Sequence, residues 1–134
     1  MNPRVGSILL DSQALSLVLD RDHRMMARLD NARRHAIPVV ASILTVVEVA
    51  RQTTDSPRLD WVLPRLHLVA EVTRTDGLTA LSLSRAADLS GQEPTVDPLV
   101  AALALRLPSP TVVYTSDPRG WRLLVGRRVG IVQI

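Results

Sequence analysis

Four acidic residues of this sequence each stand alone in an otherwise uncharged stretch: Asp11, Glu48, Asp97 and Asp117. Asp11, for example, is the only charged residue from Val5 to Leu19. Four carboxylates within about 6 Å of one another would repel by several kcal/mol in total at an effective dielectric near 20. Such a cluster persists only with a positive group among its members, and hard divalent cations take oxygen ligands of this kind. If folding brings these acids together, they predict a divalent-metal site.

Hydrolysis of a phosphodiester is the chemistry that suits such a site. A bound Mg²⁺ typically keeps several waters beside one or two carboxylates. The ion can activate one of these waters and neutralise the charge that develops on the phosphoryl group. A lone acid at the start of a helix is also a common N-cap. The metal interpretation therefore depends on whether the four acids converge.

Two of the acids directly follow predicted strands. An apolar run that begins at Val5 ends on Asp11, and a β-branched strand over Thr111–Ser116 ends on Asp117. If these strands are parallel neighbours, both acids lie at the same edge of the sheet. In open α/β sheets, the crevice beyond the carboxyl ends of the strands is where ligands bind.

The other two acids lie on predicted helices that cross near this edge. Glu48 is the only ionisable residue in the apolar stretch around it, and its helix, predicted over 43–52, is apolar nearly all round. That pattern is typical of a buried helix, so we expect Glu48 to be buried and to need a partner, either Arg51 or a cation. Asp97 is followed by Pro98, which is the pattern of an N-cap with proline at the first helical position.

The rest of the chain alternates strands and helices. Further helices are predicted over 14–19, 21–35, 59–66 and 75–89, and further strands over 38–41, 66–73 and 129–134. A polar linker is expected over 53–58, and Trp61 is expected in the core. This alternation predicts an α/β fold with a mainly parallel sheet, in a single domain that spans residues 1–134.

Composition and charge narrow the functional classes. All sixteen basic residues are arginine, and against thirteen acids they give a net charge of +3. A surface depleted of four clustered acids suits a phosphate-rich partner, although composition alone favours a solvated surface of mixed charge. The absence of cysteine excludes disulfides, thiolate catalysis and cysteine zinc sites. No apolar run reaches about 18 residues and no secretory signal is evident, so we expect no membrane association and a cytoplasmic location.

The acidic segments, taken in order, resemble the PIN-domain proteins of the VapC-like toxin ribonuclease family. The matching segments are the hydrophobic strand into Asp11 and Ser12, the SILTVVEVAR helix with Glu48, VDPLVAALA with Asp97, and TSDPRGWRLL with Thr115 and Asp117. They span residues 8 to 125 in the family's order. No single segment is specific, whereas the ordered set is.

The resemblance implies a three-layer α/β/α sandwich, a Mg²⁺ or Mn²⁺ centre, and endoribonuclease activity directed at single-stranded RNA. It also implies a homodimer, and a small cognate antitoxin that fills the active-site groove. By motif position, the residues carried over are an acidic cluster of Asp11, Glu48, Asp97 and Asp117, with Ser12 and Thr115 as supporting hydroxyls.

The resemblance also suggests how the cluster works. Asp11, Asp97 and Asp117 are expected to orient the ion, directly or through water. Glu48 either completes the ligand shell or accepts the proton of the attacking water. The aromatic fraction of 2% argues against base stacking as the main mode of RNA recognition, so backbone charge and RNA shape are the better candidates.

One feature departs from the family. Gly120 stands where many relatives have a further acid after the Asp-Pro pair, which leaves the number of bound metal ions open. Arg119 and Arg122 are close enough in sequence to Asp117 to contact flanking phosphates, although an exposed arginine as often has no specific partner.

The same residues exclude two other classes of protein and leave one open. A phosphoacceptor receiver domain needs a lysine in its crevice, and this chain has none. An Asp-x-Asp phosphatase is excluded because Ser12 and Gln13 follow Asp11. One alternative stays open, a PIN-like module that binds RNA or a partner without cleaving it, and Gly120 slightly favours it.

Overall fold

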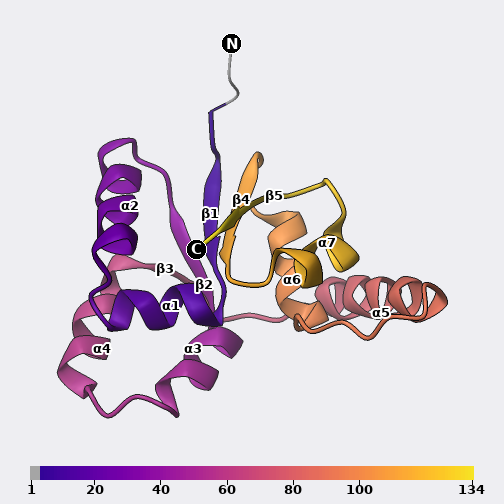
Figure 1. Cartoon of the computed structure of the whole chain (residues 1–134), viewed down its shortest axis with the longest axis horizontal. Coiled ribbons are helices and arrows are strands. Elements are labelled where there is room, and N and C mark those ends of the chain that lie inside the picture. The colour runs from indigo at the N-terminus through magenta and orange to yellow at the C-terminus, as the bar shows by residue number, and fades with distance from the viewer. Residues whose placement is uncertain (1–3) are drawn as a thin grey trace.

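A five-stranded parallel sheet forms the centre of the molecule (Figure 1). The structure, a computed structural model, describes residues 4–134. The strand order is β3-β2-β1-β4-β5, and all four neighbouring pairs are parallel. The strands are β1 (Ser7–Leu10), β2 (Val39–Ser42), β3 (His67–Val69), β4 (Thr111–Thr115) and β5 (Gly130–Gln133).

Helices cover both faces of the sheet (Figure 1). The first group is α1 (Ser12–Leu19), α2 (His23–Arg34), α3 (Ile43–Ala50) and α4 (Ser56–Val62), which continues into the 3₁₀ turn η1 (Leu63–Arg65). The second group is α5 (Arg74–Leu89), α6 (Pro98–Arg106) and α7 (Pro118–Val125). The three-layer α/β/α arrangement with a parallel sheet is therefore as expected. Within residues 4–134, none of these helices has the length and apolarity needed to cross a membrane.

Two hydrophobic cores follow from the alternation of side chains along the strands. Leu9, Val40 and Val113 point into a core with α5, α6 and α7. Their neighbours Leu10 and Tyr114 point into the opposite core with α1 to α4. The central strand β1 is buried on both faces, which explains its continuous apolar sequence.

The register of the central strands places their ends side by side. Leu10 of β1 is paired with Tyr114 of β4. The ladder extends one step further, because the backbone N–H of Asp11 donates to the carbonyl of Tyr114 at 3.2 Å. Asp11 therefore lies beside the carboxyl end of β4. Asp117 follows that strand end by two residues.

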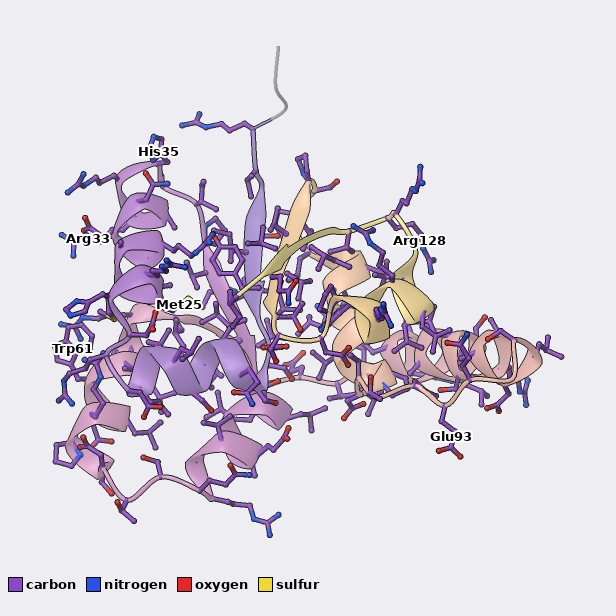
Figure 2. All side chains as sticks on the ribbon, in the orientation of Figure 1. Met25, Arg33, His35, Trp61, Glu93 and Arg128 are labelled. Carbon is purple, nitrogen blue, oxygen red and sulfur yellow. The ribbon has the colours of Figure 1, made fainter. Side chains whose placement is uncertain are left out.

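Two sequence predictions for the segment after α3 are wrong. Trp61 is not a core residue: 42% of it is exposed, and Figure 2 shows it on the outer side of α4. Its ring packs against the guanidinium groups of Arg58 and Arg65, at 4.6 and 3.7 Å from the ring centroid. The expected linker over 53–58 also ends early, because Asp55 caps α4 through the backbone N–H of Arg58.

The predicted strand over 66–73 is likewise too long. Only His67–Val69 pairs with β2, so the residues from Ala70 onward, Glu71 among them, lie outside the strand. β3 is an edge strand, and short edge strands limit unwanted pairing with other chains.

An ion pair joins α5 to the end of α6. Asp76, which is 4% exposed, accepts hydrogen bonds from Arg106 Nε at 2.7 Å and Nη2 at 3.0 Å. The same carboxylate accepts from the N–H of Thr73 and completes a capping box at the start of α5. The hydrogen bonds from Arg106 hold the pKa of Asp76 below its usual value of 3.8.

We expect Asp76→Asn to lower the free energy of unfolding by about 1–3 kcal/mol at neutral pH, because it leaves Arg106 without its charged partner. A carboxyl whose pKa is lower in the folded state contributes stability above its unfolded pKa and loses it as pH falls through the folded pKa. Urea denaturation should therefore show the variant and the original chain converging well below pH 3.8. Asp30→Asn, at the exposed Asp30–Arg34 pair, is the matched control and should change stability by less than about 1 kcal/mol. A difference for Asp76→Asn that persists unchanged in strong acid would contradict this assignment.

Candidate active site

The four isolated acids line one cleft of about 400 Å³ at the carboxyl edge of the sheet, the lower end in Figure 1. Asp11 follows β1, Asp117 follows β4, Glu48 lies on α3, and Asp97 precedes α6. The cleft is also lined by Ser12, Gln13, Thr45, Thr95, Val96, Val100, Ser116 and Trp121. Residues from four separate parts of the chain thus meet in one place.

Three of these acids are N-caps of helices that start at the cleft. Asp11, Asp97 and Asp117 cap α1, α6 and α7, and each uses its Oδ1 to accept a backbone N–H, at 2.9, 2.8 and 3.0 Å. Each of these aspartates therefore caps a helix and lines the cleft at the same time. The amino end of a helix carries a partial positive charge that favours a nearby carboxylate. These three helix ends offset part of the repulsion among the acids.

Asp11 and Asp117 have pKa values shifted in opposite directions. Burial raises the pKa of Asp11 above 3.8, against hydrogen bonds from Thr115 and from backbone N–H groups, and the charge of Asp117 raises it further. The pKa of Asp117 is lowered, because the Thr95 hydroxyl and the backbone N–H of Gly120 donate to its carboxylate. Asp117 thus keeps its charge to lower pH than Asp11.

The two predicted hydroxyl residues each contact an acid or its backbone. Thr115 is fully buried, and its Oγ1 accepts from the backbone N–H of Asp117 at 2.9 Å. Ser12 donates its hydroxyl to Glu48 Oε2 at 2.9 Å. The Ser12 contact joins α1 to α3 across the cleft.

Glu48 differs from the sequence prediction in its environment. It lies on an exposed face of α3 together with Val47, which is 53% exposed, so the carboxylate is not buried. The partner that the structure provides is the Ser12 hydroxyl, and within the described residues Glu48 forms no ion pair with Arg51. An exposed carboxylate at the rim of the cleft is open to solvent and to a substrate.

The remaining predicted contacts lie outside the cleft. Arg119 and Arg122 are exposed on α7, and neither lines the cleft. Arg122 Nη1 is directed to the carbonyl of Gly126 at 3.4 Å. The predicted role of Arg119 and Arg122 at the cleft therefore stays a prediction.

The sequence interpretation missed Thr95. Its hydroxyl donates to Asp117 Oδ2, from a loop 22 residues earlier in the chain. A signal was present, because Thr95 precedes Asp97 in the same Thr-x-Asp spacing in which Thr115 precedes Asp117.

The donor set fits a hydrated divalent cation better than a closed cage of protein ligands. In the range 4–134, no three histidine or acidic side chains are grouped closely enough to hold an ion among them. Mg²⁺ is commonly bound through one or two carboxylates, with waters filling the other positions. The cleft offers carboxylate oxygens and room for water, which agrees with that mode of binding.

Comparison with known proteins identifies the fold. No protein-family model and no curated protein sequence matches the chain. Solved structures do match it in shape. The VapBC2 complex from Rickettsia felis, bound to a DNA fragment from its promoter, contains a chain with a TM-score of 0.78 at 12% identity, over 95% of this chain and 98% of that one. DNA-bound VapBC from Salmonella typhimurium gives 0.73 at 14% identity, over 95% and 97%.

A third structure gives the same result. FitAcB from Neisseria gonorrhoeae matches with a TM-score of 0.66 at 20% identity, over 92% of this chain and 95% of that chain. At these identities the likeness defines the fold, which is the PIN-like three-layer α/β/α sandwich. The fold predicted from the sequence is confirmed.

Asp11→Asn should stabilise the metal-free protein at neutral pH. Folding raises the pKa of Asp11, so its ionised form costs stability above that pKa and costs nothing once the group is protonated. Asparagine removes the charge and is an equally good N-cap for α1. Urea midpoints in chelator-treated buffer should rise near neutral pH and should not rise well below pH 3.8. Asp22→Asn, at the N-cap of α2 outside the cleft, is the matched control and should leave the midpoint unchanged. A loss of stability in Asp11→Asn at neutral pH would show that the Asp11 carboxylate is not under strain in the cleft.

Proposed function

We propose that this chain is a Mg²⁺- or Mn²⁺-dependent endoribonuclease that acts as the toxin of a toxin–antitoxin pair. One observation carries the proposal: four acids that are isolated in the sequence line a single cleft at the carboxyl edge of a PIN-like sheet. The likeness of the whole chain to VapBC and FitAcB structures supports the toxin assignment.

Asp11, Asp97 and Asp117 are the residues that would hold the ion, directly or through water. When bound, a divalent cation lowers the pKa of a coordinated water and neutralises charge on the phosphoryl group. Other residues of the chain would hold these aspartates in place. Thr115 and Thr95 hold Asp117 through its backbone and its carboxylate. Helix caps fix the three aspartates, so little reorganisation is needed during the reaction.

Glu48 is the best candidate for the general base. It is exposed at the rim of the cleft, and the Ser12 hydroxyl orients one of its oxygens. A base must reach the proton that it removes, and a carboxylate at the mouth of the cleft can contact water and substrate together. Ser12 then acts by holding Glu48 in place.

RNA is the proposed substrate because all sixteen basic side chains are arginine and outnumber the thirteen acids. Guanidinium groups bind phosphate in a bidentate manner. Arg119 and Arg122 project from α7, which begins at the cleft, and are proposed to contact phosphates of the flanking strand. The alternative, a module that binds RNA or a partner without cleaving it, rests on Gly120 and is separated by the experiment below.

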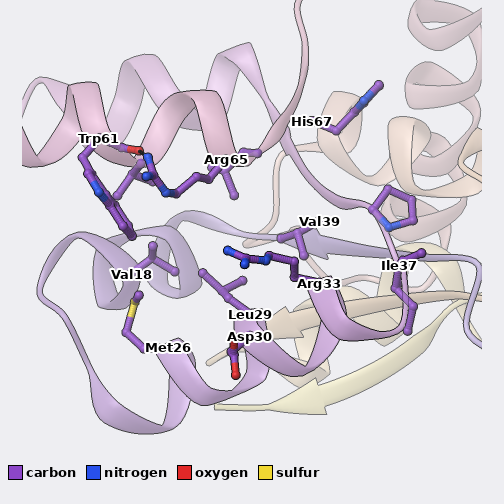
Figure 3. Close-up of a pocket in the computed structure, with 14 residues that line it drawn as sticks. Val18, Met26, Leu29, Asp30, Arg33, Ile37, Val39, Trp61, Arg65 and His67 are labelled. Carbon is purple, nitrogen blue, oxygen red and sulfur yellow. Dashed lines mark hydrogen bonds between the residues drawn. The ribbon is translucent and has the colours of Figure 1, made fainter.

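A protein antitoxin is the proposed partner, and the family resemblance implies that it fills the active-site groove. A second cavity, separate from that groove, offers a further contact for such a partner. This cavity of about 620 Å³ lies between α2 and α4 (Figure 3). Its apolar lining includes Met26, Leu29 and Val62, and Trp61 and Arg65 stand at its α4 side. An apolar floor beside arginines suits an amphipathic segment with acidic residues.

Asp97→Asn should abolish Mn²⁺-dependent cleavage of single-stranded RNA without loss of fold, because asparagine retains the cap of α6 and removes a proposed metal ligand. Mn²⁺ should raise the melting temperature of the original chain by mass action, and by less in the variant. Gel assays and thermal denaturation measure the two effects. Asp55→Asn, at the N-cap of α4, is a control that should retain both. If the original chain binds a panel of RNAs in Mn²⁺ but cleaves none, the binding module is the correct interpretation.

We also propose a homodimer, as the family resemblance implies, formed through the exposed leucines of α5. Leu78, Leu81 and Leu89 are 55%, 46% and 91% exposed on a helix that extends away from the sheet (Figure 1). Sedimentation should show a dimer that Leu81→Glu converts to monomer, because a charge at the interface is desolvated on association. Leu68→Glu, on the edge strand β3, is the matched control. A dimer that resists Leu81→Glu and is lost in Leu68→Glu would assign the interface to the sheet edge.

A further inference from the structure

The third residue of α7, Gly120, has no room for a side chain. Gly120 has no left-handed backbone angle, so its conformation is open to other residues. A Cβ built at this position would overlap Asp117 Oδ2 and Thr95 Oγ1, and would lie 2.9 Å from Asp117 Cγ. The place where a side chain would stand is therefore filled by the Thr95–Asp117 contact.

Thr95 fixes the orientation of a proposed metal ligand from another loop. Its hydroxyl donates to Asp117 Oδ2, while the backbone N–H of Gly120 donates to Oδ1 at 3.0 Å. Both carboxylate oxygens of Asp117 then have a partner, so rotation of the group breaks one bond or the other. Thr95 itself is exposed, and Val96 beside it packs on the core of α5, α6 and α7.

This contact also joins two metal-ligand candidates. Thr95 is two residues before Asp97, the cap of α6, and Asp117 is the cap of α7. The loop before α6 is thereby tied to the turn before α7 at the point where both carboxylates enter the cleft. The Thr95 contact therefore links the loop that carries Asp97 to the turn that carries Asp117.

We propose that Thr95 is a positioning residue that holds Asp117 in register with Asp97, and that Gly120 lacks a side chain so that this contact can form. The inference rests on the proposed metal-dependent function and deepens it. It also explains the departure at Gly120, because a hydroxyl supplied by a different loop occupies the space that a further acid would use.

The test compares Thr95→Val, Thr95→Ser and Gly120→Ala. Thr95→Val keeps the shape and removes the hydroxyl, and loss of such an outer partner lowers metal affinity or activity about 10–100-fold. Calorimetric titration with Mn²⁺ should show this loss, and RNA cleavage should show a lower kcat with an unchanged KM. Thr95→Ser should restore both, because it keeps the hydroxyl. Thr53→Val makes the same substitution at a hydroxyl outside the cleft and should match the original chain.

Gly120→Ala tests the space rather than the hydroxyl. The overlapping atoms are the ends of two side chains, so Asp117 can rotate away and the fold survives, while alanine favours a helix by up to about 1 kcal/mol over glycine. We expect unchanged or greater stability in urea together with a loss of Mn²⁺ affinity similar to that of Thr95→Val.

The outcomes distinguish a failure of this inference from a failure of the proposed ribonuclease function. If the original chain binds Mn²⁺ and cleaves RNA, and Thr95→Val does so equally well, the positioning role is overturned and the proposed function stands. Equal impairment of Thr95→Ser and Thr95→Val also overturns it, as does normal Mn²⁺ affinity in Gly120→Ala. If the original chain neither binds Mn²⁺ nor cleaves RNA, the proposed function fails and this inference fails with it.

Discussion

The parallel direction of the strands is the constraint on which the structure depends. Because every strand runs the same way, strand ends and helix beginnings gather at one edge of the sheet. Three helices start there with an aspartate at the N-cap, so each carboxylate is fixed by its own helix. The same three aspartates thus cap their own helices and meet in one cleft.

The helix that carries Ser12 is held at both ends. Asp11 caps the amino end of α1, and the buried guanidinium of Arg58 donates to the carbonyls of Val18 and Leu19 at 2.7 and 3.3 Å at the other end. A cation near the carboxyl end of a helix also complements its dipole. The position of the Ser12 hydroxyl at the cleft, and through it Glu48, therefore follows from contacts on opposite sides of α1.

The sequence predicts the fold well, because its alternating strands and helices are typical of a parallel α/β sheet. It also predicts that the four acids face one cleft, but within residues 4–134 no three of them are grouped as closely as the sequence interpretation assumed. It predicts environment less well. α3 is apolar in sequence, yet Val47 and Glu48 are exposed, since apolarity does not require burial. Trp61 is exposed, and its ring packs against the guanidinium groups of Arg58 and Arg65, a pairing that an apolar residue in a helical pattern does not reveal. Thr95 contacts Asp117 across 22 residues, and although the Thr-x-Asp spacing marks Thr95, that spacing does not show which carboxylate its hydroxyl reaches.

The three aspartates cap helices as well as being the proposed metal ligands, and this has a consequence for how the protein can evolve. An asparagine at any of the three caps preserves the helix start, and aspartate and asparagine codons differ by one nucleotide, so the proposed metal chemistry can be lost in a single mutation that leaves the fold intact.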